Sequence, residues 1–228
     1  MRYRAIVFDY DGTIIDTERV IFTCWQEVFR EHGLDLPLSD WAHVVGAASD
    51  AADPYAMLAR RLGRDVDRHA VERRRRPREM ELLAAEPPRP GVASLLREAK
   101  QAGLKIGLAS NSPLAWVIRG LDAAGLAGLF DTVCTPDDGA LPKPDPALYR
   151  LAVQRLGVAP SQAIAIEDSP HGANAALGAG LCCVVVPGEL TRDQVFPPGA
   201  IRLETLEGLD VAGLVARCAS NRAKGDGS

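Results

Sequence analysis

The chain contains two kinds of hydrophobic pattern, and the first is an alternation of short apolar runs with longer amphipathic stretches. The apolar runs predict buried strands of the parallel-sheet type at residues 5–8, 105–109, 130–134, 163–166 and 182–186. Between them, apolar residues at helical spacing predict helices over residues 92–102, 113–124, 146–156 and 170–179. This alternation predicts a Rossmann-like α/β core with helices on both faces of a parallel sheet.

Residues 17–86 show the second pattern, in which apolar positions recur at helical spacing without a convincing strand. Helical patches are expected around residues 17–33, 41–45, 54–62 and 70–84. The proline-rich stretch Glu86–Gly91 then forms a stiff joint. We therefore expect an all-helical domain over residues 17–88, inserted into a core of residues 1–16 and 89–228. The polar, glycine-rich stretch Ala219–Ser228 is expected to be a disordered tail.

Composition narrows the class of protein. The chain has 228 residues and a formal net charge of -4, so we do not expect it to have a strongly cationic surface of the kind that binds nucleic acid. No apolar run approaches roughly 20 residues, so no membrane span is expected. Asp9 and Asp11 interrupt any apolar segment of a signal peptide. The five cysteines are odd in number and show no CxxC spacing, which is typical of reduced thiols in a cytoplasmic protein.

Polar residues follow several of the expected strands, at the carboxyl ends where ligands bind in open parallel sheets. They are Asp9 and Asp11 after the first strand, the stretch Ser110–Asn111–Ser112 after the second, Lys143 before a later helix, and Glu167 and Asp168 after the fourth. Each signal has an ordinary alternative. The acids alone could belong to a solvated loop, and Ser112–Pro113, Asp145–Pro146 and Ser169–Pro170 could be helix caps. Their convergence on one rim favours a site.

The acids on this rim suit phosphoryl transfer. A carboxylate can attack phosphorus and form an aspartyl-phosphate, and Asp9 is placed for that attack. Such an attack needs cationic help, which Mg²⁺ supplies when it is held by hard oxygen ligands. Asp9 and Asp168, with Glu167 as a further candidate, would hold the ion. Asp11 suits the acid/base that protonates the leaving oxygen and then deprotonates water.

The remaining polar residues suit phosphate binding. Ser110 and Asn111 could hold phosphate oxygens with a hydroxyl and with backbone N–H groups at the mouth of a helix. Lys143, between Pro142 and Pro144, would place a positive charge on the phosphate and on Asp9.

The stretches DYDGT, SNS, KPDP and EDSPHG occur in an order and at a spacing that resemble the haloacid dehalogenase superfamily. The stretch EDSPHGANAALGAG is most similar to the branch of phosphoglycolate phosphatase and β-phosphoglucomutase, with a helical type 1 cap. The resemblance implies a phosphatase that acts on a small phosphorylated metabolite. By position it makes Asp9 the nucleophile, Asp11 the acid/base, and Ser110 and Lys143 phosphate-binding residues. Asp9, Asp168 and the Asp11 carbonyl become magnesium ligands, and Glu167 a direct or water-mediated ligand. Thr13 would steady the nucleophile loop and is a further candidate phosphate ligand.

Two other functions stay open at this point. A phosphosugar mutase could use the same scaffold, although family mutases carry a histidine after the first motif and a cap lysine. Here Ile21 stands at the matching position and no lysine precedes Lys100, which favours net hydrolysis. A non-catalytic binding protein is disfavoured because every catalytic position is kept.

The expected cap is rich in arginine. Nine of the 22 arginines lie between Arg60 and Arg78. They could form a solvated helix face, which is the ordinary interpretation, or a basic lid that steers anionic substrates. Binding of nucleic acid is disfavoured because no aromatic residue interleaves the run.

Overall fold

The structure is a computed structural model that describes residues 3–41 and 53–225, with side chains as far as residue 221. The chain divides into two compact units, a core of Met1–Asp16 with Pro87–Ser228 and a cap of Thr17–Glu86. The second boundary lies two residues before the one expected from the sequence. Pro88 bridges to Ile15, and the Arg89 backbone N–H donates to the Ile14 carbonyl at 2.8 Å. These contacts attach the end of the proline-rich stretch to the core.

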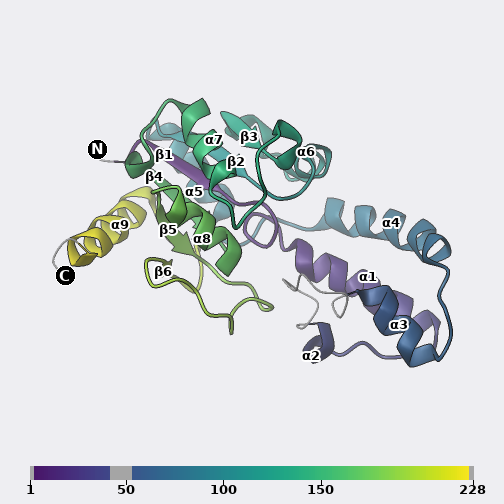
Figure 1. Cartoon of the computed structure of the whole chain (residues 1–228). Coiled ribbons are helices and arrows are strands. Elements are labelled where there is room, and N and C mark those ends of the chain that lie inside the picture. Colours follow the sequence, from purple (N-terminus) through teal and green to yellow (C-terminus); the bar gives the residue numbers. More distant parts are fainter. Residues whose placement is uncertain (1–2, 42–52, 226–228) are drawn as a thin grey trace. The chain divides into compact units, whose positions relative to one another are not determined.

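A six-stranded sheet, parallel throughout, forms the centre of the core and confirms the expected α/β class (Figure 1). Its strands are β1 (Ala5–Phe8), β2 (Lys105–Ala109), β3 (Thr132–Cys134), β4 (Ala163–Glu167), β5 (Cys182–Val185) and β6 (Ile201–Arg202), in the order β3-β2-β1-β4-β5-β6. Phe8 pairs with Leu108 of β2 and with Ile166 of β4. Residues that follow these three strands therefore meet at one rim.

Helices cover both faces of the sheet. They are α5 (Val92–Gln101), α6 (Leu114–Ala123), α7 (Ala147–Leu156), α8 (Pro170–Gly178) and α9 (Val211–Gly225), with short 3-10 turns at Ala127–Leu129, Pro136–Asp138 and Pro160–Gln162. Ala5 and Val7 of β1 pack with α7 and α8 in one apolar cluster. Helices α5 and α9 contact each other and lie on β2 and on β5 and β6, respectively. The sheet is thus buried on both sides, which explains its continuous apolar strands.

The helix starts near the site test the capping alternatives. Ser169 caps α8, because its side chain accepts from the Gly172 N–H at 3.1 Å. Asp145 accepts from the Ala147 N–H at 2.8 Å at the start of α7. Ser112 does not cap α6; the Leu114 N–H at that helix start donates instead to Asp137, 23 positions later, at 2.9 Å. The hydroxyl of Ser112 is therefore free for another use.

The expectation of a disordered tail from Ala219 is wrong for the residues that the structure describes. Helix α9 continues to Gly225. Val211, Leu214 and Cys218 are buried at helical spacing, so the helix is anchored to the sheet along one face. Strand β6 and helix α9 lie in a stretch where the sequence predicts no element. None of the five cysteines, all of which lie in the described part of the chain, forms a disulfide, and Cys182 is partly exposed.

The cap unit contains α1 (Thr17–Glu31), α2 (Leu38–Trp41), α3 (Pro54–Leu62) and α4 (Arg68–Ala85). No strand occurs among its described residues, in line with the helical pattern. Val20, Cys24 and Val28 of α1 are buried at helical spacing, and α1 packs against α4. Residues 42–45 of one expected helical patch lie outside the described residues. Among the parts of the chain that are described, no helix has the length and apolarity needed to cross a membrane.

Candidate active site

The loop after β1 carries Asp9 and Asp11 and is fixed by its backbone. The N–H groups of Thr13 and Ile14 donate to the Tyr10 carbonyl, and the Gly12 N–H donates to the Ile15 carbonyl at 2.8 Å. Gly12 has a φ of 74°, which favours glycine. A Cβ at Gly12 would also collide with the carboxylate of Asp168. Glycine therefore lets the loop turn and leaves Asp168 its place at the rim.

Arg89 fastens this loop to the neighbouring part of the core. Its Nη1 donates to the carbonyl oxygens of Gly12 and Val186, and its Nη2 donates to that of Pro187 at 3.1 Å. The guanidinium offers donors in a fixed planar fork, so one side chain can bind several carbonyls at once. The loop after β1 is thereby tied to the residues that follow β5.

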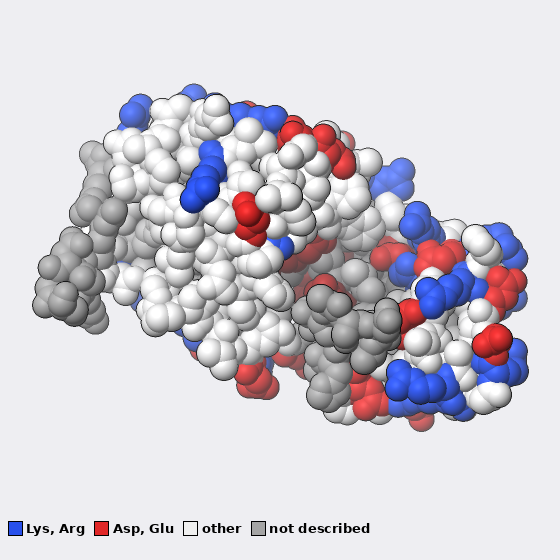
Figure 2. Space-filling model, viewed as in Figure 1, with Lys and Arg blue, Asp and Glu red and all other residues white. Residues whose placement is uncertain are grey.

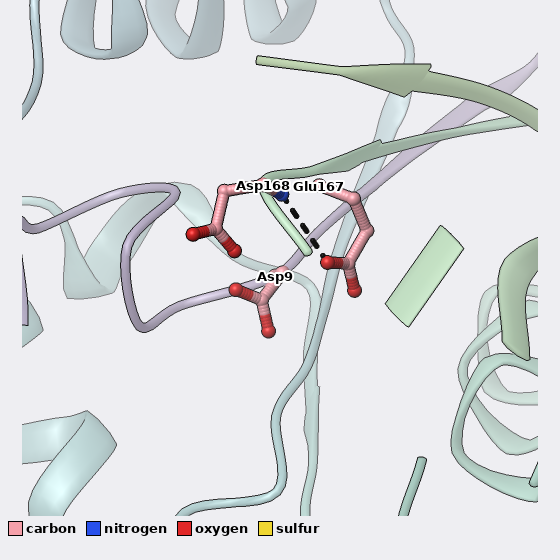
Figure 3. A group of neighbouring side chains, drawn as sticks. All are labelled: Asp9, Glu167 and Asp168. Carbon is pink, nitrogen blue, oxygen red and sulfur yellow. Dashed lines mark hydrogen bonds between the residues drawn. The ribbon is translucent and has the colours of Figure 1, made fainter. Parts of the chain in front are cut away.

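Lys143 lies between two carboxylates at the carboxyl ends of β1 and β4. Its Nζ donates to Asp9 Oδ1 at 2.5 Å and to Glu167 Oε1 at 2.6 Å. The three side chains are 4%, 9% and 0% exposed, respectively. Asp9, Glu167 and Asp168 come from adjacent strand ends and turn their carboxylates toward one region (Figure 3). The structure thus brings together Asp9, Lys143, Glu167 and Asp168, four of the residues expected at this rim.

Glu167 is held by more donors than the sequence suggests. Tyr149 Oη of α7 donates to Glu167 Oε1 at 2.6 Å, while the Asp168 N–H and Ser169 Oγ donate to Oε2, both at 3.3 Å. A Cβ at Gly172 would collide with the Glu167 carboxylate, so glycine at this position of α8 makes room for it. Glu167 therefore has a defined orientation and presents one oxygen to Lys143.

Burial and charge act against each other at this site. Burial raises the pKa of Asp9 to about 7; Lys143 opposes this rise, whereas Glu167 and Asp11 add to it. Burial acts to lower the pKa of Lys143, but Asp9 and Glu167 outweigh it and raise that pKa above its usual value. Burial, with help from Glu167, raises the pKa of Tyr149 well above its usual value. The ammonium and the phenol thus keep their protons and act as donors.

The acidic cluster fits a divalent cation. Carboxylate oxygens of Asp9, Glu167 and Asp168 lie within 4.8 Å of one another, and all three residues are buried. Lys143 is the ammonium that contacts two of them, which leaves carboxylate charge in excess when all four groups are ionised. Hard oxygen donors of this kind suit a hard divalent ion. The donor set and its charge therefore fit a divalent metal ion.

Asp11 turns to a different set of partners. Ser110 Oγ and Ser112 Oγ donate to its Oδ2 at 3.2 and 2.6 Å, and Trp116 Nε1 donates to its Oδ1 at 2.9 Å. The side chain of Asp11 does not belong to the metal-type cluster. Asp9 and Asp11 stand two residues apart in the sequence, yet their side chains bind entirely different partners.

Asn111 and Thr13 differ from the other expected phosphate ligands. Asn111 Nδ2 donates to the Lys143 carbonyl at 3.1 Å, and its Oδ1 accepts from the Lys143 N–H at 2.7 Å. The Asn111 side chain is thus committed to the backbone of Lys143. The hydroxyl of Thr13 is buried and has no hydrogen-bond partner among the described residues, so the loop is held by backbone bonds and by Arg89 instead.

Four residues at this rim were not predicted as site residues: Ser112, Trp116, Tyr149 and Arg89. Ser112 resembled a helix cap, and Tyr149 lies on the apolar face of α7, where it resembles a core residue. Trp116 carries no charge and stands in a helix. Each contacts the site across more than 15 positions of sequence. Local patterns do not show such contacts.

The arginines of the cap are largely paired. Six of the nine form ion pairs among the described residues: Arg61, Arg68, Arg74, Arg75, Arg76 and Arg78. Acidic and basic side chains intermingle on the face of this unit that Figure 2 shows. The pairing supports the ordinary interpretation of a solvated, charge-balanced helix face.

The fold and the site define an enzyme class: a parallel α/β core whose strand ends present a buried carboxylate, a lysine and a cation-type acidic cluster. A family model described as haloacid dehalogenase-like hydrolase matches residues 3–180, and the chain belongs to this family. The resemblance seen in the four sequence motifs is thereby confirmed.

Individual relatives cover nearly the whole chain. YhcW of Bacillus subtilis (strain 168) is 41% identical over 92% of this chain and 94% of its own. Fructose-1-phosphate phosphatase YqaB of Escherichia coli (strain K12) is 32% identical over 81% and 97%. The crystal structure of CbbY from Rhodobacter sphaeroides in complex with phosphate has a TM-score of 0.73 and 31% identity, and it covers 93% of this chain and 99% of that one. A second CbbY structure, at 30% identity and a TM-score of 0.73, holds xylulose-(1,5)bisphosphate over the same shares. The present chain is an enzyme, a phosphoric monoester hydrolase of this family.

Proposed function

We propose that this enzyme is a Mg²⁺-dependent phosphatase of a small phosphorylated metabolite and that it works through an aspartyl-phosphate on Asp9. The observation that carries the proposal is the buried contact of Asp9 with Lys143 and Glu167, beside Asp168. Such a site combines a nucleophile with the positive charge that attack on an anionic phosphate requires.

The proposed chemistry has two steps. In the first, a carboxylate oxygen of Asp9 attacks phosphorus while the bond from phosphorus to the leaving oxygen breaks, and Asp11 gives that oxygen a proton. In the second, Asp11 takes a proton from water, which attacks the phosphorus and releases Asp9 and inorganic phosphate. Bound Mg²⁺ supplies Lewis-acid stabilisation of the phosphoryl oxygens. Asp9, Asp168 and the Asp11 carbonyl would hold the ion.

Glu167 fits a role through water better than a direct bond to the ion. Both of its oxygens already accept protein donors, including Lys143 and Tyr149. A carboxylate with this many donors is best suited to orient the lysine and any ordered metal-bound water. We therefore favour the water-mediated alternative for Glu167.

Ser110, Lys143 and the backbone near Asn111 would bind the phosphate. Ser110 is fully buried at the end of β2, and Lys143 reaches the nucleophile. Asn111 would contribute through its N–H and by holding the Lys143 backbone from both sides. Thr13 would contribute its hydroxyl, which is buried in the nucleophile loop. An ammonium beside the nucleophile stabilises charge as it develops on the transferring group.

The test is release of inorganic phosphate in the presence of Mg²⁺ from a panel of small phosphate esters. The panel includes fructose 1-phosphate and xylulose 1,5-bisphosphate, as the names of the relatives suggest, with phosphoglycolate and nucleotides. We expect turnover of at least one sugar phosphate, abolished by excess chelator and restored by Mg²⁺. The variant Asp9→Asn serves as the background. Absence of release from every ester, or full activity in chelator, contradicts the proposal.

The mutase alternative needs a separate measurement. With β-glucose 1-phosphate and a trace of the 1,6-bisphosphate, we expect inorganic phosphate as the main product. The reason is that the cap carries no lysine and has Ile21 where family mutases have a histidine. Accumulation of glucose 6-phosphate well above inorganic phosphate would overturn the phosphatase proposal in favour of the mutase.

A further inference from the structure

The carboxylate of Asp11 is held by three neutral donors. Ser110 and Ser112 donate to Oδ2, and Trp116 Nε1 donates to Oδ1 at 2.9 Å. All three donors come from the end of β2 and the first turn of α6. Both oxygens of Asp11 thus have protein partners, and these partners are separate from the lysine that binds Asp9.

The three donors differ in how firmly they define a direction. Ser110 Oγ also accepts from the Ser112 N–H at 3.0 Å, so the two serines belong to one braced loop. A hydroxyl can rotate to follow its acceptor, whereas an indole carries one donor on a rigid ring. Trp116 therefore restrains the rotation of the Asp11 carboxyl group more strictly than the two serines do, and its loss should allow that group to rotate.

A second contact between α6 and the loop after β1 helps to position Trp116 beside Asp11. Trp116 and Gly120 stand four residues apart on α6 and share one side of the helix. The ring of Tyr10 packs against Gly120, where a Cβ would collide with the Tyr10 hydroxyl. One side of α6 therefore contacts two successive residues of the loop, Tyr10 through packing and Asp11 through the indole. The packing of Tyr10 on Gly120 therefore fixes the position of the Trp116 indole relative to the Asp11 carboxylate.

We propose that Trp116 is a positioning residue for the acid/base, and that its indole N–H sets the orientation in which Asp11 meets the leaving oxygen. The inference rests on the proposed function, in which Asp11 protonates that oxygen. Trp116 acts through Asp11 rather than on the substrate. Its loss should therefore harm the reactions that need the acid and spare those that do not.

The variant Trp116→Phe keeps an aromatic, though smaller, ring and removes the N–H donor. The measurement is kcat/KM with Mg²⁺ for two aryl esters, phenyl phosphate and p-nitrophenyl phosphate, because kcat/KM reports the step that expels the leaving group. Phenolate leaves poorly without a proton, whereas nitrophenolate leaves readily. We expect a loss of about tenfold for phenyl phosphate and about twofold or less for p-nitrophenyl phosphate, since general acid catalysis contributes ~10²–10⁴-fold when it is complete.

Two further variants complete the test. Ser112→Ala removes the 2.6 Å bond to Asp11 and should show the same selectivity in a variant that retains the indole. Trp41→Phe is the matched control, because Trp41 Nε1 is buried without a hydrogen-bond partner among the described residues. It should leave the ratio of the two rates unchanged. Circular dichroism establishes that each variant is folded.

The reference is Asp11→Asn, for which we expect the same selectivity and a larger loss. If Asp11→Asn is selective and both Trp116→Phe and Ser112→Ala lose equally on the two esters, or not at all, the positioning role is wrong and the proposed function stands. If Asp11→Asn itself lacks selectivity, the acid role in the proposed function fails. Selective loss in Trp116→Phe with an unchanged ratio in Trp41→Phe supports the inference.

Discussion

Lys143, buried in the core, and Arg75, partly buried in the cap, are both cations held between two carboxylates, yet their surroundings differ. Lys143 joins Asp9 and Glu167, which lie 134 and 24 positions away. Arg75 joins Glu72 and Glu79, three and four positions away on the same helix. The ion pairs of the first cluster are assembled by the tertiary fold, whereas those of the second lie within α4.

The two clusters also differ in charge and in packing. Arg75 lies over the ring of Trp25, with its guanidinium carbon 5.4 Å from the ring centroid, and its two acids balance nearby arginines. Lys143 has a third acid, Asp168, close to its two partners, so carboxylate charge is in excess. Removing one partner from a charge-balanced cluster destabilises the fold, whereas a buried cluster with excess carboxylate charge is a candidate site for binding a cation. The predictions below test this distinction.

Asp9→Asn should have the largest effect. We expect kcat to fall by several powers of ten, because no neighbouring group can replace a covalent nucleophile. The fold should persist, as the amide is nearly the same size. Phosphate release and circular dichroism on purified protein measure both, with the exposed Asp122→Asn as the matched control. Retention of a tenth of the activity would exclude the covalent mechanism.

Lys143→Met should come next, with a loss of about 10²–10³ in kcat. Methionine keeps most of the length of the side chain and removes its charge from Asp9. The corresponding change in the cap, Arg75→Met, should alter kcat by less than about twofold if that cluster is structural. Steady-state kinetics gives kcat for both variants. Similar losses of kcat in the two variants would show that the clusters do not differ in function.

Asp168→Ala should weaken metal binding and activity together. We expect the Mg²⁺ concentration for half-maximal activity to rise at least about tenfold, since one hard oxygen ligand is removed. Calcium should support little turnover or inhibit, because it takes more ligands at longer distances than Mg²⁺ does. Titration of each metal into chelator-treated enzyme provides the measurement. An unchanged Mg²⁺ requirement would remove Asp168 from the metal site.

Arg75→Met should have its main effect on stability. The side chain is 12% exposed, and its removal leaves Glu79, which is 11% exposed, without its partner. We expect a loss of about 2 kcal/mol in the free energy of unfolding of the cap, below the cost of breaking a fully buried pair. Urea unfolding followed by the fluorescence of Trp25 and its neighbours measures the change.

Arg76→Met is the matched control for that measurement. Arg76 follows Arg75 and also binds Glu72, but its side chain is 78% exposed. Surface pairs of this kind contribute about 0–1 kcal/mol, so we expect little change. Equal destabilisation in the two variants would show that burial is not what makes the Arg75 cluster structural.

Local patterns in the sequence were sufficient for most of the elements. Strands β1 and β2 and helix α3 have the predicted bounds, because apolar runs and capping residues are local signals. Helix α9 was not predicted, because its buried residues, including Leu214 and Cys218, are few and stand among small residues such as Ala212 and Gly213. Such a helix can be identified from its packing against the sheet but not from its sequence pattern.

In the candidate site, too, the sequence predicted some features and the packing of the fold decided others. The sequence by itself determined that Asp9, Lys143 and Asp168 lie at one rim, because parallel strands present their carboxyl ends together. Only the tertiary structure decided that Asp11 turns to Trp116, that Tyr149 donates to Glu167, and that Asn111 holds the Lys143 backbone. Strand topology follows from periodicity, whereas the partner of a side chain depends on how distant helices pack. That packing depends on shape along the whole chain and leaves no local pattern.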